Sequence, residues 1–151
     1  TTYENMLAAW QSGTIGSLNY MQAAFPYMKE QHEGRIINFA SATGMFGIAG
    51  QLAYGSNKEA LRGLTKIAAK EWGQYGICVN VVLPGAESPA AKAWAEKFPE
   101  EYQKQVMLNP MHRFGDPEDD IAPVVAFLAG PDSRYYSGQS VIVDGANSIM
   151  P

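Results

Sequence analysis

Cysteine and histidine are scarce in this chain of 151 residues, which has one cysteine and two histidines. The single cysteine, Cys78, excludes an intrachain disulfide and a cysteine-based zinc site. His32 and His112 have no partner at the spacing of metal ligands, and we expect His112 to be a loop residue rather than a ligand or base. The sequence therefore predicts no metal site.

Long apolar runs and an excess of basic charge are missing as well. No run reaches the ~20 apolar residues that a membrane span needs, and residues 1–30 lack the pattern of a signal peptide. The net charge is −4 and the lysines and arginines are scattered, which disfavours a nucleic-acid partner because phosphate binding needs a basic patch. We expect a cytoplasmic protein with neither a membrane nor a nucleic-acid partner.

What is present fits one globular domain, since 46 % of the residues are hydrophobic and the length suffices for a sizeable core. Residues 5–30 predict one long helix that ends at Glu33-Gly34. Its apolar face holds Leu18, Met21, Phe25 and Met28. Gly13 and Gly16 weaken this helix, so we expect a tight packing contact there.

Strands and helices alternate in the rest of the chain. Strands are expected over residues 35–40, 77–82 and 139–143. Helices are expected over residues 51–72, over residues 88–108 as one or two helices, and from Asp116 to residue 129. Residues 41–50 are expected to form a loop. This alternation predicts an α/β fold with a parallel sheet. Three strands are few for such a sheet, and the chain begins with Thr1 rather than methionine, so we expect a longer protein.

Tyr54 and Lys58 lie four residues apart on the helix expected over residues 51–72, so their side chains share a face. A tyrosine, with an ordinary pKa near ~10, is a poor acid–base catalyst at neutral pH, but a nearby ammonium group favours the phenolate. The pair is therefore suited to proton transfer. The spacing alone is common, and more often marks a core tyrosine beside an exposed lysine.

Ser41 directly follows the strand expected over residues 35–40, thirteen residues before Tyr54. Ligands bind at the carboxyl edge of parallel sheets, and a connection of this length can bring the Ser41 hydroxyl beside the phenol. A serine there can hydrogen-bond a substrate oxygen as charge develops on it. The commoner role of a loop serine is to cap the backbone.

Consecutive blocks of this sequence resemble the short-chain dehydrogenase/reductase family: residues 34–38, 41–44, 54–58, 79–85, 110–118 and 137–145. The resemblance covers essentially the whole chain. It implies an α/β fold in which residues 1–151 form the C-terminal catalytic portion of one Rossmann-like domain, a doubly wound parallel sheet with helices on both faces. It also implies an NAD- or NADP-dependent oxidoreductase that interconverts a secondary alcohol and a ketone by hydride transfer.

The resemblance assigns roles to residues of this chain. Tyr54 would be the proton donor or acceptor, Ser41 would polarise the carbonyl oxygen, and Lys58 would assist Tyr54 and hold the cofactor ribose. The cofactor-binding residues would be Tyr54, Lys58, Pro84, Gly85, Ala86 and Ser88. We also expect a substrate pocket of Ser41, Thr43, Met45 and Trp94, with core packing as the default alternative for Met45. An apolar lid would consist of Trp94, Phe98, Tyr102 and Met107, while the lysines and glutamates of the same segment indicate a solvated face.

The family's N-terminal half, with the glycine-rich turn that cradles the cofactor pyrophosphate, is absent from this chain. The residue that selects NAD or NADP belongs to that half. We therefore expect residues 1–151 alone to bind the cofactor poorly and to be inactive by themselves. The alternative is a non-catalytic homologue or fragment that serves as an oligomerisation or binding module, and a third reading is an epimerase or dehydratase on the same scaffold.

Two single positions also depart from the family pattern. An asparagine of the long helix that completes a proton relay in the family falls on Gly13 here, next to Thr14. The threonine that follows Pro-Gly in the family is missing, and Ser88 is the nearest hydroxyl; it either contacts the nicotinamide or caps a helix.

Helices equivalent to residues 5–30 and 51–72 commonly form a subunit interface in the family. The apolar tail, residues 148–151, fits burial against a neighbouring subunit. The resemblance therefore implies a homodimer or homotetramer.

Overall fold

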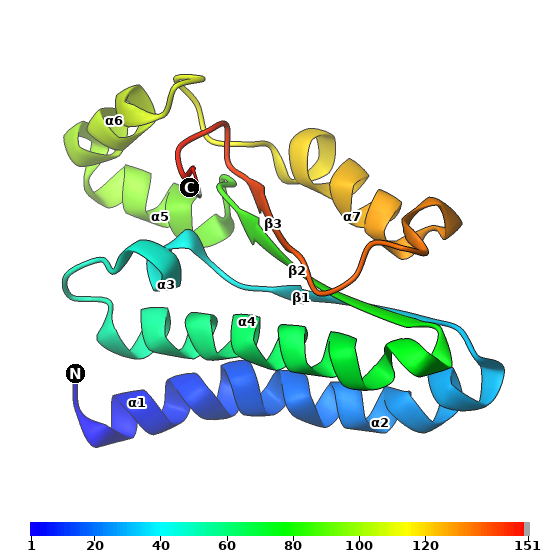
Figure 1. The fold of residues 1–151 in the computed structure, drawn as a ribbon. Helices are drawn as coiled ribbons and strands as arrows, with labels where there is room; N and C mark the ends of the chain where they lie inside the picture. The colour runs from blue at the N-terminus through cyan, green and yellow to red at the C-terminus, as the bar shows by residue number, and fades with distance from the viewer. Residues whose placement is uncertain (150–151) are drawn as a thin grey trace.

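The computed structural model describes residues 1–149. Its centre is a parallel sheet with the strand order β1-β2-β3, formed by β1 (Gly34–Phe39), β2 (Ile77–Pro84) and β3 (Ser140–Val143). Figure 1 shows α4 (Leu52–Trp72) and α2 (Gly16–Gln31) on one face of this sheet and α7 (Ala122–Ala129) on the other. The expected α/β fold with helices on both faces is confirmed.

The strand β2 forms the centre of the core because it is apolar and covered on both faces, as is usual for a parallel sheet. Val79, Val81 and Val82 are completely buried. Val79 packs with Met21 of α2 and Ala68 of α4. These contacts fix α4 against the sheet, and α4 carries the predicted proton-transfer pair.

The long N-terminal helix has three parts: α1 (Tyr3–Trp10), a π-helical turn over Gln11–Ile15, and α2. It ends at His32, which adopts the left-handed conformation with φ 52°. The helix expected over residues 5–30 is therefore confirmed to within a residue at this end, and Glu33-Gly34, where the break was expected, leads directly into β1. Of the described helices, none is both long and apolar enough to span a membrane.

The segment between β1 and α4 was expected to be a loop, and half of it is helical. Ser41 begins the short helix α3 (Ala42–Phe46), and its side chain caps that helix. Gly47 and Gly50 then adopt positive φ angles of 68° and 85°, which glycine tolerates without strain. The helix escaped prediction because five residues are too few to show a periodic pattern.

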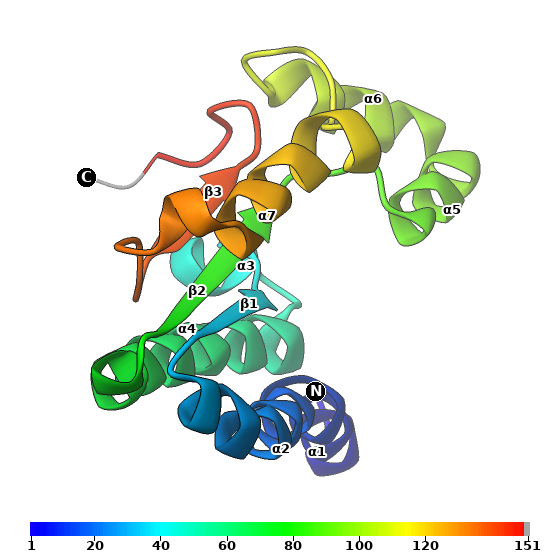
Figure 2. The same ribbon diagram turned by 90° about the vertical axis from the view of Figure 1, so that its right-hand side faces the viewer.

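The region over residues 88–108 contains two helices, α5 (Pro89–Lys97) and α6 (Pro99–Leu108), each beginning with proline. Both lie beyond the carboxyl ends of the strands (Figure 2). Asp116 accepts hydrogen bonds from the backbone N–H groups of Glu118 and Asp119, as predicted for a helix start. This cap leads through a π-helical turn over Pro117–Ile121 into α7.

Candidate active site

All three strands end at one cavity of about 350 Å³. Ser41 follows β1, Pro84 and Gly85 close β2, and Asp144 follows β3; all four line this cavity. We call it the strand-end cavity. Thr43, from α3, lines it as well. Ligands of open α/β sheets bind at this edge, so the structure gathers four of the predicted site residues, Ser41, Thr43, Pro84 and Gly85, where a ligand is expected.

Ser41 has an extended backbone, and its Oγ accepts a hydrogen bond from the N–H of Thr43 at 3.2 Å. The commoner role considered for this serine, a backbone cap, is therefore present. The cap uses one lone pair of the hydroxyl oxygen and leaves the hydroxyl hydrogen free to donate. Because the cap also fixes the direction of the side chain, it is compatible with a role in holding a ligand oxygen.

Tyr54 and Lys58 occupy the first two turns of α4. The Nζ of Lys58 lies 5.7 Å from the centroid of the Tyr54 ring, and it donates a hydrogen bond to the carbonyl oxygen of Phe39 at 2.7 Å. This bond connects the lysine to Phe39, the last residue of β1, which precedes Ser41 by two residues. The Tyr54 side chain remains accessible, with 44 % of the residue exposed.

Partial burial of Lys58 lowers the pKa of its amino group from the ordinary value, because desolvation disfavours the charged form. With one N–H engaged by the Phe39 carbonyl, two further N–H groups can donate to a ligand. The lysine is therefore both anchored and able to bind.

The predicted residues Ala86 and Ser88 lie on the segment connecting β2 to α5. Ala86 forms an isolated parallel bridge with Gly115, which ties this connection to the segment before α7. The Ser88 Oγ accepts from the N–H of Ala91 at 3.1 Å and caps α5. Of the two roles considered for Ser88, the structure contains the helix cap.

Two predicted pocket residues lie elsewhere. Met45 packs against the buried cluster of Ala40, Val81 and Leu83, while its neighbour Phe46 is among the residues lining the strand-end cavity. Trp94 makes an edge contact with the ring of Tyr102, at 5.9 Å between centroids. Neither Met45 nor Trp94 is among the described residues that line the cavity.

The remaining residues of the predicted lid are only partly covered: Phe98 and Met107 are exposed. Tyr102 contacts the ring of Phe114 and donates a hydrogen bond to Glu87 Oε1 at 2.7 Å. That hydrogen bond raises the pKa of the Tyr102 phenol, since the neutral form donates to a carboxylate. These contacts hold α6 onto the segment that leaves β2.

Asp144 is a cavity residue for which the sequence predicted no role. It is 9 % exposed, and its Oδ2 atom has no hydrogen-bond partner among the described residues. A buried acceptor of this kind usually finds a partner, so it can be satisfied by the N–H or O–H of a ligand. The Asp-Gly pair after β3 was visible in the sequence, but nothing in the pattern showed that its carboxylate would be buried.

Asn57 is a second buried residue that the sequence left without a role. Its side chain contacts Gly13 and Thr14 of the π-helical turn. The tight packing contact expected near Gly13 is therefore confirmed, and Asn57 is its other member.

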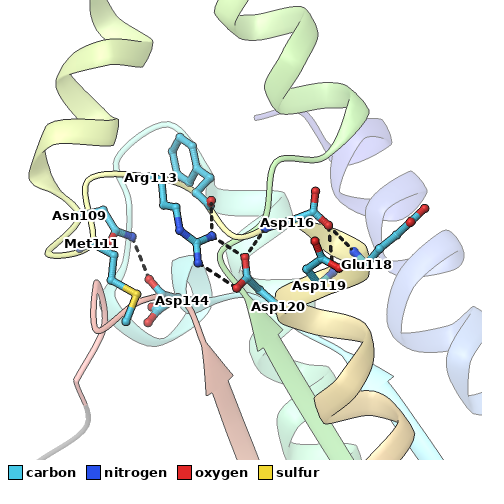
Figure 3. A network of polar contacts seen from close by, with 9 residues as sticks. Asn109, Met111, Arg113, Asp116, Glu118, Asp119, Asp120 and Asp144 are labelled. Carbon is cyan, nitrogen blue, oxygen red and sulfur yellow. Dashed lines mark hydrogen bonds and ion pairs between the residues drawn. The ribbon is translucent and has the colours of Figure 1, made fainter.

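A second cavity, of about 370 Å³, is lined by Arg113, Asp120 and Asp144. These residues belong to the polar network that Figure 3 shows. Asn109 donates to the carbonyl oxygen of Asp144 at 2.8 Å. Arg113 forms a two-pronged ion pair with Asp120, which also accepts the N–H of Asp116 at 2.6 Å. The Arg113 hydrogen bond, followed by that of Asp116, lowers the pKa of Asp120 from 3.8 to about 2.

Replacement of Asp120 by asparagine is expected to lower the melting temperature at neutral pH. A carboxyl group with a depressed pKa stabilises the fold above its unfolded pKa near 3.8, and this contribution disappears as the pH falls toward about 2. The difference between wild type and variant should therefore shrink from pH 4 to pH 2, and also in high salt because the pair is exposed. Asp119→Asn, in the same turn, is the control and should show a smaller pH-dependent difference.

The chain matches known proteins over almost its whole length. The family model described as Enoyl-(Acyl carrier protein) reductase matches residues 1–146. The 12alpha-hydroxysteroid dehydrogenase of a Clostridium species is 43 % identical over 140 residues, covering 93 % of this chain and 54 % of that protein. The 3-oxoacyl-[acyl-carrier-protein] reductase FabG of Thermotoga maritima is 39 % identical over 132 residues, covering 86 % of this chain and 52 % of the relative.

A solved structure agrees with the sequence relatives. An oxidoreductase of the short chain dehydrogenase/reductase family from Burkholderia thailandensis superposes with a TM-score of 0.91 and 28 % identity, over 97 % of this chain and 57 % of that one. This chain thus spans about half the length of the curated relatives that it matches. With its sheet, its strand-end cavity and these matches, the chain belongs to the short-chain dehydrogenase/reductase family.

Proposed function

We propose that the complete protein is an NAD- or NADP-dependent oxidoreductase that interconverts a secondary alcohol and a ketone. The observation that carries the proposal is the tie between Lys58 and the end of β1. The Lys58 ammonium donates to the Phe39 carbonyl at 2.7 Å and lies 5.7 Å from the Tyr54 ring, and Ser41 follows Phe39 by two residues. Ser41 lines the strand-end cavity, whereas Tyr54 and Lys58 are not among the described residues that line it. The tie to β1 supports a phenol, a cation and a hydroxyl that act together near the edge of the sheet where ligands bind.

Tyr54 gives its phenolic proton to the carbonyl oxygen during reduction and takes a proton from the alcohol during oxidation. The Lys58 ammonium favours the phenolate that is left after reduction, because opposite charges attract over this distance. Ser41 donates its hydroxyl hydrogen to the same substrate oxygen as negative charge develops there. The nicotinamide cofactor supplies the hydride when bound.

The residues around the strand-end cavity fit one end of such a cofactor. Its volume of about 350 Å³ lies at the lower end of the range of roughly 300–1,000 Å³ found for small-molecule sites. Pro84 and Gly85 bring backbone to its wall, Lys58 offers two N–H donors nearby, and Asp144 offers an unpaired acceptor. The pyrophosphate would be held by the half of the relatives that this chain does not span.

We also propose a cytoplasmic homodimer or homotetramer. The outer surface of the long helix supports an interface, because large apolar or aromatic side chains are exposed along it: Tyr3, Leu7, Ile15, Tyr20 and Tyr27. The predicted contribution of the tail, residues 148–151, falls partly outside the described residues; Ser148 is buried and Ile149 is exposed.

The test uses the full-length protein with NADH and NADPH. Titration of each cofactor should change its fluorescence, and one of them should support reduction of at least one ketone in a panel containing a 12-oxosteroid, a 3-oxoacyl thioester and a simple cyclic ketone. The substrate names of the relatives motivate the first two. Binding of neither cofactor, together with no turnover of any ketone, would overturn the proposal.

A non-catalytic oligomerisation or binding module is the second candidate, and the large apolar and aromatic side chains exposed along the long helix are the observation that favours it. The intact mass and N-terminal sequence of the native protein separate the two. A native chain that begins at Thr1, forms oligomers and binds neither cofactor would support the module and contradict the enzyme.

A further inference from the structure

A polar contact joins α4 to the π-helical turn directly behind the predicted proton-transfer pair. Asn57 of α4 is 4 % exposed, and its Oδ1 accepts the backbone N–H of Thr14 at 2.8 Å. The Thr14 hydroxyl lies 2.7 Å from the same Oδ1 and 2.9 Å from the Asn57 carbonyl oxygen. We call this set of contacts the Asn57–Thr14 clasp.

Gly13 is what makes room for the clasp. A Cβ atom at position 13 would lie 2.1 Å from Nδ2 and 2.4 Å from Oδ1 of Asn57, far inside van der Waals contact. The carboxamide of Asn57 therefore occupies the volume that any side chain at position 13 would need. The identities of these two residues, 44 positions apart, depend on one another.

The clasp also accounts for the irregular helix at this level. Thr14 donates its backbone N–H to the side chain of Asn57 on another helix, and the π-helical turn Gln11–Ile15 surrounds this residue. Turns of this kind interrupt the regular hydrogen-bond ladder and occur frequently at functional sites. The side chain of Asn57 satisfies this N–H, so the turn and the asparagine form one unit.

Asn57 is well placed to hold the proton-transfer pair. It immediately precedes Lys58 and follows Tyr54 by one helical turn. The start of α4 has no side-chain cap at Gln51, and it follows two glycines with positive φ, Gly47 and Gly50. On one side this part of α4 packs closely against α3, where a Cβ on Gly44 would lie 2.7 Å from the Gly55 carbonyl oxygen. On the side of the long helix, the clasp holds it.

We propose that Asn57 is a positioning residue, which acts through the clasp to fix the first two turns of α4 and with them Tyr54 and Lys58. The inference rests on the proposed function. Lys58 is held at its tip by the Phe39 carbonyl and at its backbone by the neighbouring clasp. Loss of the clasp lets the backbone of α4 shift while the lysine tip stays tied, which changes the separation between the ammonium group and the phenol.

The first test compares Asn57→Ala and Thr14→Val in the full-length protein. We expect kcat to fall about tenfold with little change in the KM of the ketone, because alignment rather than binding is lost. Thr14→Ser, which keeps the hydroxyl, should restore wild-type values.

Thr65→Val is the matched control on the same helix. It removes a fully buried hydroxyl that accepts from Asn38 at 2.9 Å and donates to the Leu61 carbonyl at 2.9 Å, two turns beyond Asn57. We expect it to lower the melting temperature as much as Thr14→Val, with kcat of the remaining folded protein unchanged. A purely structural clasp would make Asn57→Ala and Thr14→Val behave like this control, and that result would overturn the proposal.

The second test uses Gly13→Ala, alone and combined with Asn57→Ala. Alone, the added methyl group displaces the carboxamide and should reproduce the kcat loss of Asn57→Ala. In the double variant the methyl group finds space, so the second substitution should cost nothing further. Additive losses would contradict the shared volume. Failure of the proposed function itself appears differently, as a wild-type protein without turnover.

Discussion

Replacing Tyr54 with phenylalanine should lower kcat for ketone reduction by about 10³-fold, since a positioned acid or base contributes typically 10²–10⁴. The change removes one oxygen from a ring that is 44 % exposed and leaves its shape intact. The Tyr54 hydroxyl makes no hydrogen bond with another described residue, so little stability depends on it. We therefore expect an unchanged melting temperature, measured beside steady-state rates.

Tyr20→Phe is the control for that experiment. Tyr20 lies on α2 and is 82 % exposed, outside the strand-end cavity, and it loses the same atom. Its kcat should remain that of the wild type. If Tyr54→Phe reduces the ketone as fast as Tyr20→Phe does, the proton comes from another group, and Ser41, whose hydroxyl hydrogen is not used by its helix cap, becomes the residue to replace next.

The sequence predicted those parts of the fold that depend on a repeated pattern. The apolar run around Val79 predicted a strand, which the structure places at the buried centre of the sheet. The helical spacing of Met21 and its neighbours predicted a helix face that packs against the core. The position of Ser41 after β1 could be predicted for the same reason, because parallel strands all end at one edge.

Features that depend on contacts between distant segments could not be predicted this way. Gly13 indicated that something packs closely, but nothing near it in sequence identified Asn57 as the partner. The orientation of Met45 could not be predicted for the same reason. Met45 lies in a five-residue helix, and whether it faces the core or the cavity depends on how that helix is rotated by its packing against neighbouring segments. The unpaired Asp144 oxygen likewise results from tertiary burial rather than from its own sequence.

Gly85 tests how tightly the ends of β2 and β3 fit at the cavity. A Cβ on Gly85 would lie 2.6 Å from Cβ and 2.9 Å from Cα of Asp144, and the second of these is backbone. Gly85 cannot easily move away, because its N–H donates to the Val143 carbonyl and its carbonyl accepts from Gly115, both at 2.8 Å. Gly85→Ala should therefore reduce the free energy of unfolding by about 1–3 kcal/mol, as overpacking typically does.

The matched control, Gly63→Ala, should change stability in the opposite direction. Gly63 is exposed on α4, and a Cβ there meets no other atom within 4 Å. Alanine is favoured over glycine inside a helix by about 1 kcal/mol, so this variant should be more stable than the wild type. Urea unfolding of both variants measures the two opposite changes in the free energy of unfolding.

Because Gly85 lines the strand-end cavity and Gly63 does not, Gly85→Ala alone should also weaken cofactor binding in a fluorescence titration. Equal stability of Gly85→Ala and wild type would contradict the prediction of reduced stability. It would mean that the backbone at Asp144 moves to accommodate the added methyl group despite the hydrogen bonds of Gly85.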